Sequence, residues 1–208
     1  REDREDRLMY FGPFSSYEEY LKELERFHGK KAPGGVLALH MVSLARELLP
    51  EGILMDVICE TRKCLADAIQ LLTPCTVGNH WLKIVDTGRF AAVFYDKETG
   101  EGVRISLNME RLKLYPAVNE WFLKLIPKKD QDLKAIIDGI NMAGSSLFDS
   151  CPVAVDPKVL LVRPKVPPVV CPVCGEAYPP FHGPVCRGCQ GATEAYFHER
   201  PVEAAVEK

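Results

Sequence analysis

The stretch CPVCGEAYPPFHGPVCRGCQ, residues 171–190, decides the fold of the C-terminal part of this chain. It holds two Cys-x-x-Cys pairs separated by eleven residues, and such pairs can place four thiolates around one tetrahedral zinc ion. Gly175 and Gly188 would let the chain turn tightly beside each pair. A segment of about forty residues is too short to bury a sufficient core, so we expect the metal to hold it folded. The predicted ligands are Cys171, Cys174, Cys186 and Cys189.

Other uses of these cysteines fit the sequence less well. A disulfide framework needs an oxidising compartment, to which nothing in the sequence points. A thioredoxin-like redox pair needs a βαβ context that this Pro-rich stretch lacks. His182 and His198 flank the cysteines and could substitute as ligands, but four cysteines already fill a tetrahedron. Iron in a rubredoxin-like site remains the alternative to zinc.

The bulk properties indicate one domain of moderate size with a small module attached. The chain has 208 residues, of which 47% are hydrophobic, and a net charge of −3. That charge gives no bulk attraction to nucleic acid or to a membrane, and no apolar run approaches the length of a membrane span. The sequence begins REDREDR, which lacks the apolar segment of a signal peptide, so we expect a cytoplasmic protein. We divide the chain into a core domain (1–160), a zinc-binding module (161–200) and a flexible tail (201–208).

Hydrophobic periodicity predicts an α+β core domain with an antiparallel sheet. Helical spacing covers 15–29, where Ser15 or Ser16 can cap the helix and Gly29 can end it, and continues at 33–49. Strand-like runs and further helices follow. The strands are expected at 53–60, 81–86, 90–96 and 102–107, the helices at 63–73 and two or three times between 108 and 144, and a last strand at 158–163, before a Pro-rich linker.

The helix predicted at 33–49 is apolar almost all round. Only His40, Ser43 and Glu47 form a narrow polar stripe, which we expect to be solvated. Such a helix is buried on several sides, either in the centre of the domain or in a subunit interface. Its surplus of apolar surface predicts a homodimer with elements exchanged between the two chains.

A second group of reactive residues lies in the core domain, beside turn glycines. Cys64 is near the start of the helix at 63–73, where the helix dipole would lower its thiol pKa, and Cys75 follows the end of that helix. About 15 Å of helix separates the two thiols, so a shared site needs a third element, and the loop with His28 is the candidate. Each residue also has a structural interpretation: His28 could cap a helix, Cys64 and Cys75 could be small buried hydrophobes, and Asp67 could support a site or lie on the surface. Cys59 is expected in the core, and Cys151 in a turn before Pro152.

These residues carry a resemblance to the E-subunit family of formylmethanofuran dehydrogenase. That family shows Phe-His-Gly-His-x-Cys-Pro-Gly, then Asp-x-Cys-x-x-Asp-Ala-Ile-Gln running into Gly-Cys-Thr-x-Gly, then a hairpin with Gly-Val-Arg, and in some members a C-terminal zinc module. This chain is similar from about residue 27 to 107, and the cysteine module extends the similarity to its C-terminal part. The matching residues are Phe27, His28, Gly29, Pro33, Gly34, Cys64, Asp67, Ala68, Ile69, Gln70, Thr73, Cys75, Thr76, Gly78, Gly102, Val103 and Arg104.

The chain departs from that pattern at two natural metal ligands. Lys30 stands at the position of the family's second histidine, and Ala32 at the position of its motif cysteine. A protonated lysine amine and an alanine methyl group cannot coordinate a metal. We therefore predict that His28, Lys30, Cys64 and Cys75 converge on one polar pocket of the core domain, completed across a dimer. The pocket would hold either a second metal or an anion, with Asp67 as a further candidate residue.

Three classes of function follow. The resemblance implies a metal-binding accessory protein associated with molybdenum or tungsten enzymes of one-carbon metabolism, without implying that this chain performs the redox step; it also implies intertwined dimers. The second class is a regulatory protein that uses the zinc module. The zinc module carries a balanced charge, which argues against nucleic acid as its ligand and favours a protein partner. The third is a small enzyme with Cys64 or Cys75 as nucleophile and His28 as base. The candidate contact residues of the module are Tyr178, Phe181, Tyr196 and Phe197.

Overall fold

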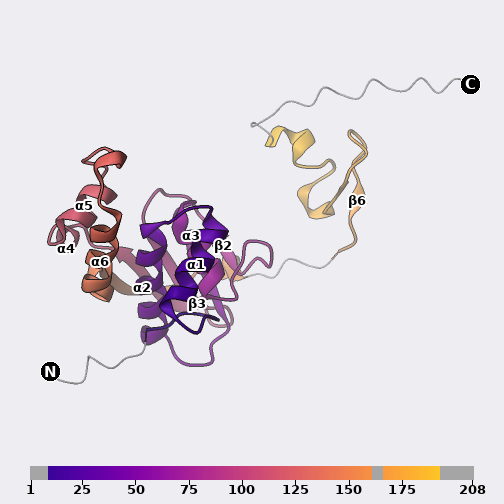
Figure 1. Ribbon diagram of the computed structural model, residues 1–208. Helices are drawn as coiled ribbons and strands as arrows, with labels where there is room; N and C mark the ends of the chain where they lie inside the picture. Colours follow the sequence, from indigo (N-terminus) through magenta and orange to yellow (C-terminus); the bar gives the residue numbers. More distant parts are fainter. Residues whose placement is uncertain (1–8, 161–165, 193–208) are drawn as a thin grey trace, which may run out of the picture. The chain divides into compact units, whose positions relative to one another are not determined.

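The computed structural model describes residues 9–160 and 166–192 (Figure 1). The chain divides into two compact units, residues 1–161 and residues 162–208, which are described separately here. The predicted tail at 201–208, together with Tyr196, Phe197 and His198, lies outside the described residues. Within the described part, no helix combines the length and the apolar character needed to cross a membrane.

A five-stranded sheet in the order β2-β1-β3-β4-β5 forms the framework of the first unit. The pairs β1–β3, β3–β4 and β4–β5 are antiparallel, as predicted, but β1 and β2 run parallel. The parallel pair arises because the helix α3 carries the chain back between these two strands, and a tight hairpin could not do so. The strands are β1 (Met55–Cys59), β2 (Leu82–Ile84), β3 (Ala91–Asp96), β4 (Glu101–Leu107) and β5 (Phe148–Ala154).

Three helices group together beside this sheet (Figure 1): α2 contacts β4 and α3, and α3 contacts α1. They are α1 (Tyr17–His28), α2 (Pro33–Leu48) and α3 (Cys64–Leu72). The ends of α1 are where the sequence predicted them: the Ser16 hydroxyl accepts the backbone N–H of Glu19, and Gly29 ends the helix at a φ of 82°. The helix α2 is buried on nearly every side because it contacts α3, α6 and β4 within its own chain.

The polar stripe predicted along α2 is wrong at His40, whose side chain is buried. The helix α6 (Leu133–Ala143) packs over this position. His40 Nε2 lies 3.1 Å from Asn141 Oδ1, and Asn141 Nδ2 donates to the Tyr17 hydroxyl at 2.8 Å. Burial lowers the pKa of His40 from its ordinary value. His40, which the sequence analysis expected to be solvated, is thus part of a buried hydrogen-bonded link between α1, α2 and α6.

This link predicts that the domain loses stability in weak acid. The folded state favours neutral His40, so as the pH falls through the ordinary histidine value of about 6.5 the unfolded chain takes up a proton that the folded chain resists. The contribution is lost below that pH and is restored above it. We expect urea midpoints measured from pH 8 to pH 5 to fall less steeply for His40→Gln than for the wild type; parallel curves would contradict the assignment.

A helical lobe is inserted between the neighbouring strands β4 and β5. It contains α4 (Met109–Leu112), α5 (Pro116–Phe122) and α6, as the periodicity predicted, with 3₁₀ turns at Lys128–Asp130 and Gly144–Leu147. Figure 1 shows the three helices gathered away from β2 and β3. The lobe leaves several large apolar side chains more than a third exposed: Leu114, Leu123, Leu125, Leu133 and Met142.

The strand β5 was missed by the sequence analysis, which placed Cys151 in a turn. Cys151 instead pairs with Arg104 in β5, at the edge of the sheet, and is exposed. Pro152 fits there because it lies opposite Val103, at a position whose missing N–H faces away from β4. The strand predicted at 158–163 is also wrong: Pro157–Leu160 forms a helix, α7, and residues 161–163 lie outside the described part.

Candidate functional site

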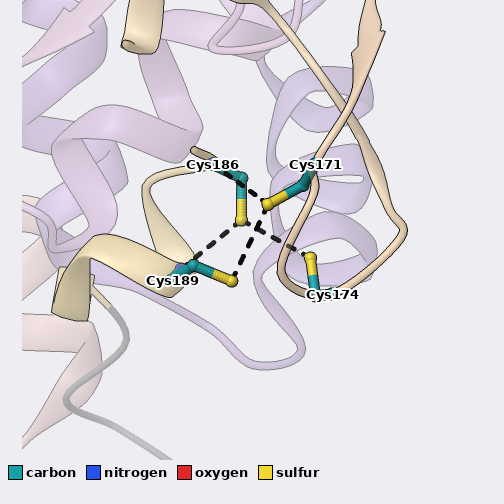
Figure 2. A group of neighbouring side chains, drawn as sticks. All are labelled: Cys171, Cys174, Cys186 and Cys189. Carbon is teal, nitrogen blue, oxygen red and sulfur yellow. Dashed lines mark hydrogen bonds between the residues drawn. The ribbon is translucent and has the colours of Figure 1, made fainter. Parts of the chain in front are cut away.

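The four cysteines of the second unit form one cluster. Figure 2 shows their sulfur atoms directed toward one another from two separate turns of the chain. All four sulfurs lie within 4.8 Å of one another; Cys171 and Cys189 are 3.9 Å apart, and Cys174 and Cys186 are 3.7 Å apart. Sulfurs bound tetrahedrally to zinc at about 2.3 Å are about 3.8 Å apart, so the residues fit a zinc ion. This arrangement supports a four-cysteine zinc-binding site.

Two short elements bring the cysteine pairs together. Cys171 and Cys174 lie on the turn between β6 (Val169–Val170) and β7 (Ala177–Tyr178), where Gly175 adopts a φ of 77°. Cys186 precedes the short helical segment Gly188–Ala192, which contains Cys189. Gly188 needs no positive φ, contrary to our expectation; Gly191 does. A 3₁₀ turn at Pro180–His182 joins the two parts.

Backbone N–H groups point at two of the sulfurs, and at Cys171 they favour the thiolate form. The N–H of Cys186 lies 3.4 Å from Cys171 Sγ, and the N–H of Cys189 lies 3.4 Å from Cys186 Sγ. The hydrogen bond from Cys186 lowers the pKa of the Cys171 thiol to about 6. Because zinc binds thiolates, these donors prepare the site for the metal.

The predicted contact residues of the module behave differently from one another. Tyr178 is buried and its hydroxyl donates to the Gly183 carbonyl at 2.9 Å, so it supports the module and does not project from it. Phe181 is 46% exposed, as a contact residue requires, and Val170 and Val173 are exposed beside the first cysteine pair. His182 is not in the metal-binding cluster.

In the core domain, His28 and Asp67 meet although they are far apart in the sequence. His28 is the last residue of α1 and Asp67 lies in the first turn of α3; the Nδ1–Oδ2 distance is 2.6 Å. Through this contact the Asp67 carboxylate orients the imidazole of His28. The contact also replaces the interpretation of His28 as a helix cap.

Cys64 starts α3 as predicted, but its thiol is not activated. A Cβ atom on Gly34 would lie only 2.5 Å from Cys64 Sγ, so only glycine lets α2 approach the thiol this closely. Burial raises the pKa of Cys64, and this effect exceeds the opposing effects of its backbone and of Lys63 and Lys30. The expectation that the helix dipole would lower this pKa is therefore wrong.

Cys75 lies beyond the other end of α3 and is fully buried. Its thiol donates to the Met55 carbonyl at 3.1 Å, and burial raises its pKa to about 11. Lys30 is exposed in the loop between α1 and α2. Within one chain the structure thus joins His28 to Asp67 and places Cys64 at the same end of α3, while Cys75 belongs to the core. Among the described residues, only the four-cysteine cluster groups three or more ligand atoms closely enough for a metal, so a second metal is not supported.

The sequence analysis missed a buried ion pair on the sheet. Glu60, just after β1, accepts two hydrogen bonds from Arg104 of β4, at 2.6 and 3.0 Å, and a third from the Thr87 hydroxyl at 3.2 Å. The hydrogen bond from Arg104 lowers the pKa of Glu60. The only sequence signal was an acidic residue at the end of an apolar run, since Arg104 had been noted only as part of the family pattern.

These environments predict the order in which the core-domain thiols react with iodoacetamide. Cys151 is exposed, whereas burial raises the thiol pKa of Cys59, Cys64 and Cys75. Cys151 should therefore be alkylated first, and the fully buried Cys59 and Cys75 last. Mass spectrometry of peptides after timed alkylation at pH 7 measures this, and Cys151→Ser should remove the fast phase. If Cys64 reacts faster than Cys151, its thiol is activated and the Cys/His enzyme gains support.

Two family models match the chain. The model described as "FmdE, Molybdenum formylmethanofuran dehydrogenase operon" matches residues 27–150, more than half of the chain, and "FmdE treble clef zinc finger" matches residues 164–198. The second match favours zinc over iron at the four cysteines.

One solved structure and one curated protein illustrate the similarity. The crystal structure of a tungsten formylmethanofuran dehydrogenase FmdE-like protein from Syntrophus aciditrophicus is 46% identical, with a TM-score of 0.76, covering 87% of this chain and 95% of that one. A probable S-adenosyl-L-methionine-binding protein from Archaeoglobus fulgidus is 30% identical in an alignment of 128 residues that covers 57% of this chain. The match spans only about a third of that relative's length (35%).

Proposed function

Because this chain belongs to the FmdE family and matches that family's treble-clef zinc finger, we propose that it is a metal-binding accessory protein of molybdenum- or tungsten-dependent one-carbon metabolism. In this role the chain binds one structural zinc ion and uses the zinc module to contact a protein partner. It works in the cytoplasm, where reducing conditions keep four free thiols available to the metal.

The observation that carries the proposal is the four-cysteine cluster itself. The module buries only two side chains among its described hydrophobic residues, Cys171 and Tyr178, so its shape depends on the metal. Phe181, Val170 and Val173 remain on its surface, and large apolar side chains of this kind are the usual anchors of a protein contact. The relative from Syntrophus aciditrophicus supports the metabolic assignment through its description as an FmdE-like protein.

Binding to a purified molybdenum or tungsten formylmethanofuran dehydrogenase tests the proposal. We expect the zinc-loaded chain to form a complex measurable by biolayer interferometry, and Val173→Asp to weaken it without releasing zinc. Asp at exposed Val85, in the core domain, is the matched control and should leave binding unchanged. Failure of the zinc-loaded wild type to bind would remove the accessory role.

We also propose that the chain forms a homodimer, but through a different surface from the one the sequence suggested. The apolar surface of α2 is buried within its own chain except at its end, where Leu48 is half exposed, so it leaves little surplus for a partner. The exposed apolar side chains of the α4–α6 lobe, which include Leu114 and Met142, are the better candidates. Light scattering at micromolar concentration should give a dimeric mass, reduced to that of a monomer by Leu114→Asp with Met142→Asp.

A further inference from the structure

A groove opens on the sheet beyond the end of α2. It has a volume of about 710 Å³ and is lined by the end of α2 and the segment that follows it, by the hairpin between β3 and β4, and by β4 and β5. Val103 and Pro152, which are cross-strand neighbours, form its floor, and Leu48, Leu49 and Ile53 form its apolar wall. The groove exists because α2 ends at Leu48 while β4 and β5 continue, so part of the helix-covered face of the sheet is left open.

The outer side of the groove is the free edge of β5. Val155 N–H donates to the Gly100 carbonyl and Asn108 N–H to the Leu147 carbonyl, which fixes the hydrogen-bonded pairs at both ends of β5. By the alternation of an antiparallel ladder, Ser150, Pro152 and Ala154 then turn their backbone groups away from β4. Their three carbonyls and two N–H groups border the groove and have no strand beside them among the described residues, since β5 is the last strand of this sheet.

The charge of the groove selects among occupants. Asp96 and Glu101 are the charged residues that line it, and both are acidic. Neither takes part in an ion pair among the described residues. Asp96 Oδ1 accepts the backbone N–H of Glu98 at 2.8 Å, and Glu101 is exposed. An apolar floor with free backbone groups on one side and carboxylates without a cationic partner on the other suits an extended chain that carries aliphatic and cationic side chains.

We propose that this groove binds an extended peptide segment of a partner protein, with aliphatic side chains on Val103 and Pro152 and a lysine or arginine at Glu101. The segment lies along β5 and hydrogen-bonds with Ser150 and Ala154. Pro152 offers no N–H, so the contact relies on side chains and on the carbonyls of β5 more than a full added strand would. The residues that line this surface all belong to the core domain, and none of them belongs to the zinc module or to the proposed dimer surface.

A fluorescein-labelled peptide of alternating valine and lysine, titrated with the full chain, tests the proposal by fluorescence anisotropy. We expect saturable binding, and a peptide of alternating valine and glutamate should not bind. Glu101→Lys should weaken binding at least tenfold, and Leu48→Asn, at a side chain already half exposed, should do the same. Glu98→Lys is the matched control, because it makes the same charge change in the same hairpin outside the groove lining and should leave the affinity unchanged.

Three results would overturn the proposal. Absence of binding up to about 1 mM peptide would remove the peptide site. Equal weakening by Glu98→Lys and Glu101→Lys would reduce the effect to general charge attraction. If light scattering shows that Leu48→Asn lowers the mass of the chain, the occupant is a second copy and the peptide assignment is wrong.

Discussion

Replacing Cys174 with serine should unfold residues 166–192 and leave the core domain folded. The described strands of the module have two residues each, so little apart from the metal holds them together. Structural zinc sites contribute about 10–16 kcal/mol of apparent binding free energy. A module this small has no other contribution of that size, so it should not stay folded once the zinc is lost. Elemental analysis should find one zinc per chain in the wild type and much less in the variant, while trypsin should cut within the module and spare residues 9–160.

The matched control for this prediction is Cys151→Ser, which changes a cysteine outside the cluster. It should keep the zinc and the resistance of the module to trypsin. A chelator should reproduce the effect of Cys174→Ser on the wild type. Stoichiometric iron in place of zinc, or a module that resists trypsin without metal, would contradict the assignment of the four cysteines.

Glu60→Ala should destabilise the core domain by about 3 kcal/mol, as the loss of one partner from a buried ion pair does. The Glu60 side chain is only 10% exposed, and its removal leaves the Arg104 guanidinium, which is 25% exposed, without its two hydrogen bonds. Urea denaturation measures the difference. Glu110→Ala, which breaks an exposed pair with Lys113, should cost less than about 1 kcal/mol.

The same pair predicts a dependence on acid. The folded pKa of Glu60 is lowered, chiefly by the hydrogen bond from Arg104, so its contribution is present above the unfolded value of about 4.3 and is lost as the pH falls through the folded value. The difference in stability between wild type and Glu60→Ala should therefore shrink below pH 4. A difference that stays constant down to pH 3 would show that the carboxylate charge does not matter.

The sequence predicted the elements whose signals are local. A serine cap, a glycine end and regular apolar spacing sufficed for α1, and the hairpin between β3 and β4 follows from Gly100, whose φ is 77°. Signals that depend on distant partners were misread. His40 looked solvated because Asn141, which covers it, lies a hundred residues further along. β5 looked like a turn because proline is rare in strands, and only its place at the edge of the sheet makes Pro152 acceptable.

The candidate sites also divide into those with local sequence signals and those that depend on residues far apart in the sequence. The zinc cysteines come as two close pairs, so their spacing alone predicts the cluster. The contact between His28 and Asp67 joins residues on two helices, and the sequence could name both without fixing their distance. For Cys64 the helix dipole was visible in the sequence, but the burial that outweighs it depends on how closely α2 packs at Gly34. Only the structure shows which of these two opposing effects on the pKa of Cys64 is larger.

The helical lobe between β4 and β5 also bears on how the domain folds and on how it can change. β5 cannot join the sheet until the whole lobe has left the ribosome, so the edge of β4 stays open during synthesis until that point. The entropy of closing such an excursion rises slowly with its length, by about 0.6 kcal/mol for each doubling if the inserted chain is flexible. Insertions at the lobe should therefore change what the protein contacts at little cost to the pairing of β4 with β5, which makes the lobe the place where relatives of this chain can diverge in length.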